Sequence, residues 1–192
     1  SEGFFKQLLS PGVLVFYVSV ALMQLSHGPY YTFLTLHLEQ LGYSRGIIGM
    51  LWAVGVVAEV LMFMAMSRIL QRFSVRHVLI TSFALASVRW LLLGNFADHL
   101  PVLMFAQLLH AATFGSYHAA AIHFLQRSFG PRQQGQGQAL YAALSGTGGA
   151  MGALYSGYSW NALGAEWTFA IASVAALIAA VLAATRMKEA VL

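Results

Sequence analysis

Six long apolar runs, separated by short polar turns, fill almost the whole of this 192-residue chain. A helix needs about 20 residues to cross the hydrocarbon layer of a bilayer, so each run is long enough to span a membrane. Charged residues make up only 8% of the sequence, whereas soluble domains carry roughly a quarter. The predicted fold is therefore an all-α membrane protein. Its six transmembrane helices are expected at residues 11–36, 46–69, 75–96, 101–124, 139–158 and 166–185.

The connections between these runs are too short to hold a soluble domain, so residues 1–192 are expected to form a single six-helix transmembrane domain. The sequence opens with Ser-Glu-Gly rather than Met, which suggests a fragment or a processed chain. It contains no cysteine, which excludes disulfides and thiolate metal sites. No histidine spacing matches a zinc motif, so neither a metal nor another cofactor is expected.

The basic residues predict the orientation of the chain in the membrane. Lys and Arg concentrate on the cytoplasmic side of membrane proteins. Alternate loops here agree, because only Arg45 falls on the opposite side and Arg89 lies inside a span. Both termini are thus expected to be cytoplasmic, and the net charge of +4 indicates orientation in a lipid bilayer rather than binding to nucleic acid. The residues on the cytoplasmic side are Lys6, Arg68, Arg72, Arg76, Arg127, Arg132, Arg186 and Lys188.

Three ionisable side chains fall within successive spans: Glu59, Arg89 and His110. Ionisable residues inside a membrane are costly and usually mark a functional site. A structural ion pair between two helices is the alternative, although such pairs add little stability compared with apolar contacts. Counting about 1.5 Å per residue from the cytoplasmic boundaries predicts that Glu59 lies closer to Arg89 than to His110. Together they suggest a site that couples transport to protons.

Polar residues recur at helical spacing in the first and fourth spans and are expected to line a cavity. Hydrogen bonding between helices is the alternative. Pro29 is expected to kink the first span beside its polar stripe. His118 and His123 are interpreted as hydrogen-bonded packing residues. The stripes contain Gln24, His27, Gly28, Tyr31 and Thr35, and then Gln107, His110, Thr113, Phe114 and Tyr117.

The last two spans differ in character. The fifth contains Gly148 and Gly152, a GxxxG pair that allows two helix backbones to approach closely. Close packing is the favoured interpretation of this pair, and a hinge is the alternative. The sixth span, from Phe169 to Thr185, carries no charge and is expected at the periphery without site residues of its own.

These residues resemble the C-terminal half of a major facilitator superfamily transporter, in the branch that contains lactose permease and the phenylpropionate and nucleoside proton symporters. The resemblance rests on residues 55–59 (GVVAE), 87–90 (SVRW) and 107–115 (QLLHAATFG), and it covers nearly all of the chain. It implies that Glu59, Arg89 and His110 take part in substrate binding and proton coupling. Thr113 stands where lactose permease has a second glutamate, so Glu59 is the one core carboxylate expected to carry a proton.

The resemblance also implies a wider architecture. Each half of such a transporter consists of two inverted three-helix repeats, and substrate binds near the midplane between two halves. The repeat boundary is expected near residues 95–101. The rest of the site would come from a missing N-terminal half or from a second copy of the chain. The location implied is the inner (plasma) membrane of a bacterium.

The function expected from the sequence is proton-coupled transport (symport) of a small organic solute, with an aromatic acid as the candidate substrate. A self-contained half-transporter or channel acting as a homodimer is the alternative. A membrane hydrolase is not expected, because the Gly-x-Ser-x-Gly elbow and paired catalytic carboxylates are both missing from the sequence. The proton-coupling residues expected are Glu59, Arg89 and His110. The substrate-binding residues expected are Gln24, His27, Tyr31, Trp52, Arg89, Thr113, Phe114 and Tyr117.

Overall fold

The computed structural model describes residues 2–187, and within this range it is almost entirely helical with no β-strand. Lys188, one of the basic residues assigned to the cytoplasmic side, lies outside the described range. In chain order the helices are α1 (Glu2–Leu8), α2 (Pro11–Ser26), α3 (Gly28–Gln40), α4 (Arg45–Arg72), α5 (Val75–Asn95), α6 (Leu100–Leu108), the π-helix η1 (Ala111–Ser116), α7 (Tyr117–Ser128) and α8 (Gln134–Arg186).

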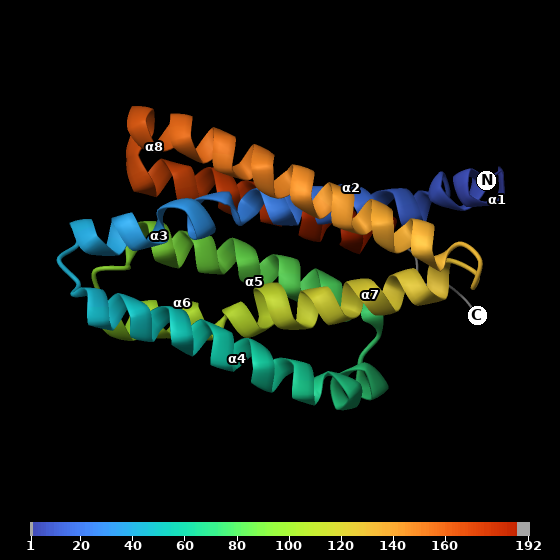
Figure 1. Ribbon diagram of the computed structural model, residues 1–192, viewed down its shortest axis with the longest axis horizontal. Helices are drawn as coiled ribbons and strands as arrows, with labels where there is room; N and C mark the ends of the chain where they lie inside the picture. The colour runs from blue at the N-terminus through green and yellow to red at the C-terminus, as the bar shows by residue number, and fades with distance from the viewer. Residues whose placement is uncertain (1, 188–192) are drawn as a thin grey trace.

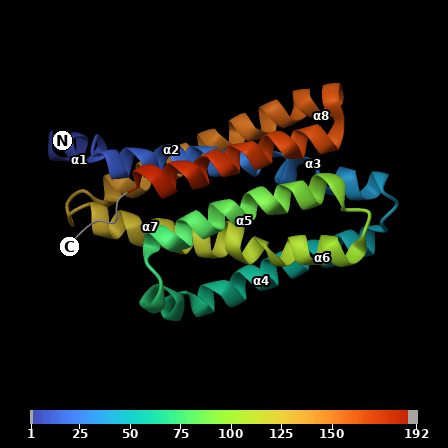
Figure 2. The ribbon, with the colours of Figure 1, turned by 180° about the vertical axis from the view of Figure 1, so that it is seen from behind.

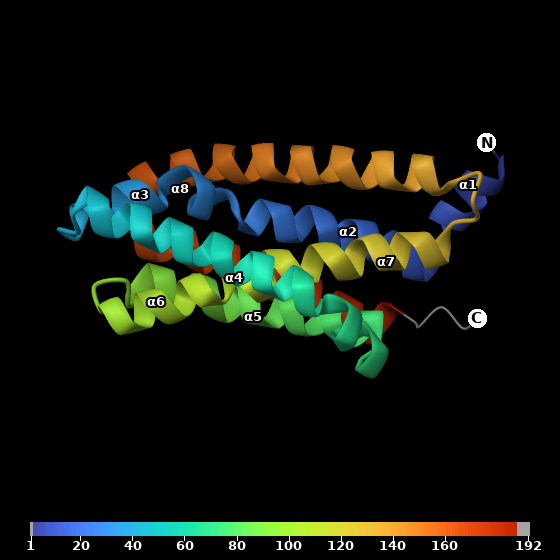
Figure 3. The same ribbon diagram turned by 60° about the horizontal axis from the view of Figure 1, so that its bottom comes forward.

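Local sequence explains where several helices begin. The hydroxyls of Ser44 and Ser74 accept hydrogen bonds from the backbone N–H groups of Ile47 and His77, capping α4 and α5. The first predicted span is divided into α2 and α3 at His27, two residues before Pro29 (Figure 3). Proline cannot donate the backbone hydrogen bond that a continuous helix would need. The predicted break beside the polar stripe is confirmed.

Four helical stretches in the described range are long and apolar enough to cross a membrane: Pro11–Gln40, Arg45–Arg72, Val75–Asn95 and Gln134–Arg186. This confirms a helical membrane protein. The predicted fourth span is divided among α6, η1 and α7, while the fifth and sixth both fall within the 53 residues of α8.

α8 is a hairpin rather than one straight rod. Figure 1 shows its orange part running along the top of the bundle and its red part returning beneath. The reversal occurs at Gly164, whose φ of 85° and ψ of −179° are outside the helical range. Glycine adopts such a positive φ without strain, whereas other residues rarely do. α8 packs against α2 and α5 (Figure 2).

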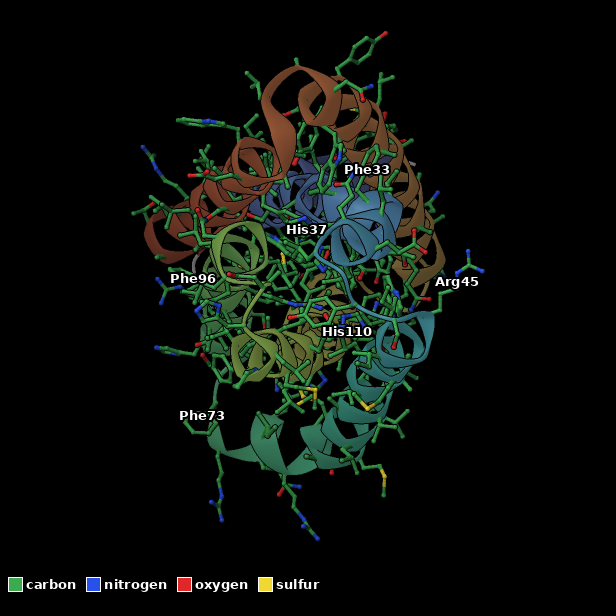
Figure 4. The ribbon with its side chains drawn as sticks, turned by 90° about the vertical axis from the view of Figure 1, so that its left-hand side faces the viewer. Phe33, His37, Arg45, Phe73, Phe96 and His110 are labelled. Atoms are coloured by element: carbon green, nitrogen blue, oxygen red, sulfur yellow. The ribbon has the colours of Figure 1, made fainter. Side chains whose placement is uncertain are left out.

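Both ends of the described chain lie at the same end of the bundle, where the α4–α5 and α7–α8 connections also lie (Figure 1). We name this the basic end, because these connections and helix termini contain Arg68, Arg72, Arg76, Arg127 and Arg132. Arg76 donates from Nε to the carbonyl of Met187 at 2.6 Å, which ties α5 to the end of α8. Arg45 lies at the opposite end and points away from the bundle (Figure 4).

The outer surface of the bundle is apolar. α4 exposes Val57, Leu61 and Met64, and the returning part of α8 exposes Val174 and Val181. The opposite face of that returning part is lined by buried alanines that pack against the bundle. Exposed aliphatic side chains on the outside of long helices are typical of a surface in contact with lipid.

The GxxxG pair brings α8 into contact with the break between α2 and α3. A Cβ atom at Gly28 would collide with the backbone of Gly152, and one at Gly148 would lie 2.7 Å from the carbonyl oxygen of Ala21. A side chain at Gly152 would in turn collide with the carbonyl of Leu25. The close-packing interpretation of Gly148 and Gly152 is confirmed.

Replacing Gly152 by Ala is therefore expected to destabilise the protein by about 1–3 kcal/mol, the usual cost of overpacking. Gly149 provides the matched control, because a Cβ there meets nothing within 4 Å. The thermal unfolding midpoint of each purified variant in detergent tests this. Equal midpoints for Gly152→Ala and Gly149→Ala would contradict the assignment.

Candidate functional site

Arg89 is the centre of a buried polar network. Its side chain is completely buried in α5, and it donates from Nε to the carbonyl of Ala106 at 2.8 Å. The Nη1 atom of Arg89 donates to Thr113 Oγ1 at 2.8 Å and lies 3.2 Å from His110 Nδ1. Nη2 donates to Gln107 Oε1 at 3.1 Å. The planar guanidinium thus links α5 to three positions in α6 and η1 and to His110 between them.

The contact with Arg89 sets the tautomer of His110. A guanidinium can only donate, so His110 Nδ1 must be the acceptor and carry no proton. The ring proton then lies on Nε2, which is 2.9 Å from Glu59 Oε2. His110 therefore donates to the Glu59 carboxyl group and remains neutral as long as both contacts hold. A transferable proton can then be held only on Glu59.

The prediction that Glu59 lies closer to Arg89 than to His110 is wrong. Glu59 forms its hydrogen bond with His110, and within the described range no carboxylate lies within ion-pair distance of Arg89. Arg89 reaches Glu59 only through the imidazole ring. The earlier expectation assumed a uniform rise along every span. The π-helix after His110 has wider turns, so its residues advance less along the axis than α-helical residues do.

The Arg89 charge is stabilised by aromatic rings as well as by neutral acceptors. Its guanidinium carbon lies 4.1 Å from the centre of the Tyr30 ring and 5.0 Å from that of Trp90. Both distances are within the range of cation–π attraction. Tyr30 also accepts a hydrogen bond from Gln107 Nε2 at 3.3 Å.

Two residues of this network, Tyr30 and Gln107, were missing from the predicted site. Gln107 is fully buried, and its amide bridges Arg89 to Tyr30 and to the carbonyl of Leu51 in α4. Gln107 does lie on the predicted polar stripe of the fourth span, three residues before His110. This spacing could have identified it as a site residue. Tyr30 follows Pro29 directly, and only the break at His27 turns its ring toward Arg89.

The chain near His110 departs from α-helical geometry. α6 ends at Leu108, and residues Ala111–Ser116 form the π-helix η1. Single-turn π-helical segments within longer helices often occur at functional sites. Gly115 in η1 also allows α4 to approach closely, because a Cβ there would lie 3.1 Å from the side chain of Met62. Figure 4 shows His110 in the interior of the bundle, viewed from the end opposite the basic end.

Three predicted substrate-binding residues form an aromatic group next to this network. The Tyr31 ring is stacked on His27, with ring centres 5.9 Å apart, and on Trp52 at 6.5 Å. Tyr31 is about half exposed (53%), while His27 is buried. Trp52 also packs against Tyr30 at 4.9 Å, which links this group to Arg89. His27 donates from Nδ1 to the carbonyl of Met23, and its buried Nε2 is left as an acceptor without a partner.

Other predicted site residues lie apart from Arg89. The hydroxyl of Tyr117 lies beside Gln24 and Tyr141 rather than beside Glu59. Phe114 lies between His110 and His118, with its ring centre 5.6 Å from that of the His110 ring and 5.7 Å from that of the His118 ring. The ionisable residues and the polar stripes predicted from the sequence are therefore divided, with Glu59, Arg89 and His110 in one network and Gln24 and Tyr117 in another.

His118 is a hydrogen-bonded residue inside the bundle, as the sequence interpretation expects. Its Nδ1 forms a hydrogen bond with the Tyr141 hydroxyl at 2.8 Å. Within residues 2–187, no group of three or more His, Asp and Glu side chains is arranged to hold a metal ion.

Comparison with known proteins agrees with this architecture. Residues 1–171 match the MFS_1 like family. The chain is 33% identical over 165 residues to the probable 3-phenylpropionic acid transporter of Escherichia coli strain K12. That alignment covers 84% of this chain and 43% of the relative, so the chain spans less than half the length of the protein it matches. The chain belongs to the MFS_1 like family, and thus to a superfamily of membrane transporters rather than to a class of enzymes.

Proposed function

We propose that this chain forms one half of a proton-coupled symporter for a small aromatic carboxylic acid. The observation that carries the proposal is the chain of contacts from Arg89 through His110 to Glu59. It leaves one carboxyl group in this network able to gain or lose a proton, beside a buried cation that has no carboxylate partner among residues 2–187. The substrate class is suggested by the 3-phenylpropionic acid named for the E. coli relative.

In this proposal the chain crosses the membrane six times, as two inverted three-helix repeats with their boundary near residues 95–101. The two parts of α8 make separate crossings, and α6, η1 and α7 together make one. Both termini are cytoplasmic, in accordance with the arginines at the basic end, and the membrane is the bacterial inner membrane. The other half of the substrate site comes from an N-terminal half or from a second copy of the chain.

Coupling follows from the charges. When Glu59 is ionised, its negative charge offsets that of Arg89 through His110 and repels a carboxylate substrate. When Glu59 is protonated, the Arg89 charge is left uncompensated and attracts the substrate anion, because electrostatic interactions are strong in a site of low dielectric. The anion therefore binds together with a proton. Arg89 acts at a distance in this conformation, because its side chain is completely buried and its donors are already engaged.

The substrate ring is proposed to bind against Tyr31 and Trp52 of the aromatic group and against Phe114, which stacks on His110. Offset and edge contacts between aromatic rings each contribute about 0.5–1.5 kcal/mol. His27 would contribute its unpaired Nε2 as an acceptor. Thr113 would contribute by holding Arg89. Gln24 and Tyr117 would meet the substrate only after a rearrangement, because they lie beside Tyr141 and not beside Glu59.

Uptake of radiolabelled 3-phenylpropionate by cells expressing the protein tests the function. An inward proton gradient should drive accumulation, and collapsing the gradient with a protonophore should abolish it. Accumulation that is unaffected by the protonophore would contradict proton coupling. If no labelled acid accumulates, the proposed substrate is wrong.

Replacing Trp52 by Leu should raise the substrate concentration needed for half-maximal uptake by about 3–10-fold, the equivalent of one lost aromatic contact. The side chain contacts Tyr30 and Tyr31 and donates from Nε1 to Thr35 at 3.0 Å, but it is not part of the Glu59 network. The maximal rate should change little. Trp167, which is 60% exposed on α8, offers a control as Trp167→Leu. An unchanged half-saturating concentration in Trp52→Leu would exclude Trp52 from the substrate site.

A further inference from the structure

A second polar cluster lies between Phe114 and the basic end. It contains the hydrogen-bonded pair of His118 on α7 and Tyr141 on α8. The hydroxyls of Tyr117 and Ser145 and the side chain of Gln24 on α2 lie around the Tyr141 hydroxyl. Three helices thus direct polar side chains to one place inside the bundle. Nothing in the Glu59 network accounts for them.

Two hydroxyls in this cluster lack a proper hydrogen-bond partner. The Tyr117 hydroxyl and the Ser145 Oγ are both buried, and neither forms a hydrogen bond of good geometry, although Tyr141 is close to each. A buried polar group without a partner costs roughly 1–3 kcal/mol. Buried waters typically occupy such positions, where several polar atoms converge. The cluster is therefore suited to hold water.

Phe114 separates His118 of this cluster from His110, the hydrogen-bond partner of Glu59. Its ring lies between the imidazoles of His110 and His118 and is nearly parallel to both, with interplanar angles of 14°. An apolar ring in this position prevents direct proton transfer between the two histidines. Toward the basic end, by contrast, polar residues continue on the same face of α8, at Gln138 and Gln134, one and two turns before Tyr141.

We propose that His118, Tyr141, Tyr117 and Ser145, with Gln24, form a water-binding relay that passes the Glu59 proton toward the basic end, and that Phe114 is its gate. When Phe114 moves aside, His118 takes the proton at Nε2 and releases one from Nδ1 to the Tyr141 oxygen. Tyr141 passes its own hydroxyl proton to a bound water. His118 and Tyr141 end neutral, and the water carries the proton away as hydronium. This inference rests on the proposed proton coupling and specifies its release path.

Few other ionisable groups act on His118. Tyr141 faces it from α8, and Tyr117 is adjacent on its own helix. α4 presents the ring of Phe63 to it at 6.4 Å, and the ionisable residue of α4 at the level of this region is Glu59. α2 contributes the uncharged Gln24. Apart from the Glu59 carboxylate, a proton on His118 would therefore have no fixed countercharge among these groups, which favours release over storage.

The test compares two reactions of the full chain in liposomes containing a pH-sensitive dye. Net influx of 3-phenylpropionate with protons requires the release step, whereas exchange of labelled for unlabelled 3-phenylpropionate without a gradient does not. His118→Asn and Tyr141→Phe are each expected to slow net proton influx by at least about tenfold, because they remove a proton-transfer group, with exchange remaining within about twofold of the original rate. His123→Asn and Tyr158→Phe are the matched controls on the same two helices and should change neither reaction.

The outcomes separate the two proposals. Unchanged proton influx in both His118→Asn and Tyr141→Phe would overturn the relay while leaving the transport proposal intact. An equal loss of influx and exchange in Tyr141→Phe, which retains the ring, would show a packing role and would also overturn the relay. If the unaltered protein moves substrate without protons, the proposed symport itself fails.

Discussion

Replacing Glu59 by Gln should abolish net proton-driven uptake while preserving exchange of substrate across the membrane. The amide accepts the hydrogen bond from His110 Nε2 in place of the carboxylate, but it cannot gain or lose a proton. It resembles the protonated, substrate-binding form of Glu59, so exchange should continue. Net uptake should fall by on the order of 100-fold, the lower range for loss of a proton-transferring side chain. Parallel measurement of gradient-driven uptake and of exchange in liposomes distinguishes the two effects.

Glu39→Gln is the matched control. Glu39 is exposed near the end of α3, and its contact with Arg45 is long, at 4.0 Å. Exposed pairs of this kind contribute about 0–1 kcal/mol, so both reactions should proceed as in the unaltered protein. If Glu59→Gln also retains gradient-driven uptake, Glu59 does not carry the transported proton.

Replacing Arg89 by Met should have the largest effect on stability. The change leaves the carbonyl of Ala106, the Gln107 amide oxygen and His110 Nδ1 without their donor inside the bundle. Removing one partner from a buried charged network typically costs about 3–5 kcal/mol. His110 would also be free to adopt its other tautomer and would no longer be held as a donor to Glu59. The thermal unfolding midpoint in detergent measures the loss of stability.

Arg89→Lys is expected to recover only part of this loss. A lysine ammonium cannot reproduce the planar arrangement of donors that Arg89 directs to α6, His110 and Thr113. Arg72→Met, at an exposed position at the end of α4, serves as the control and should unfold at the original temperature. An Arg89→Met protein as stable as Arg72→Met would show that the network contributes little to the fold.

Features set by local sequence could be predicted. The apolar runs, the break beside Pro29 and the close approach at Gly148 and Gly152 each follow from the chemistry of a few neighbouring residues. The rare ionisable residues within the runs likewise drew attention to Glu59, Arg89 and His110. These features depend on composition and spacing and not on how the helices are rotated against one another.

Which side chains of the site contact one another could not be predicted, because this depends on how the helices are rotated and packed against one another. The depth of His110 was misjudged because nothing in residues 111–116 marks them as π-helical. Tyr30 was missed because its ring reaches Arg89 only after the chain breaks at His27. Gln24 and Tyr117 share the polar stripes of their helices, yet they lie beside Tyr141 and not beside Glu59. The position of a residue on the polar stripe of its helix therefore identified it as a candidate, but did not show which of the two polar clusters it joins.

Proton uptake on substrate binding tests the central claim most directly. Purified protein in weakly buffered detergent is mixed with 3-phenylpropionate, and a pH indicator reports the protons removed from solution, at a pH where Glu59 is largely ionised before substrate is added. We expect a proton to be taken up with each substrate bound by the unaltered protein, and none by Glu59→Gln although it binds substrate. Equal proton uptake by the two proteins would contradict the assignment of Glu59 as the coupling group.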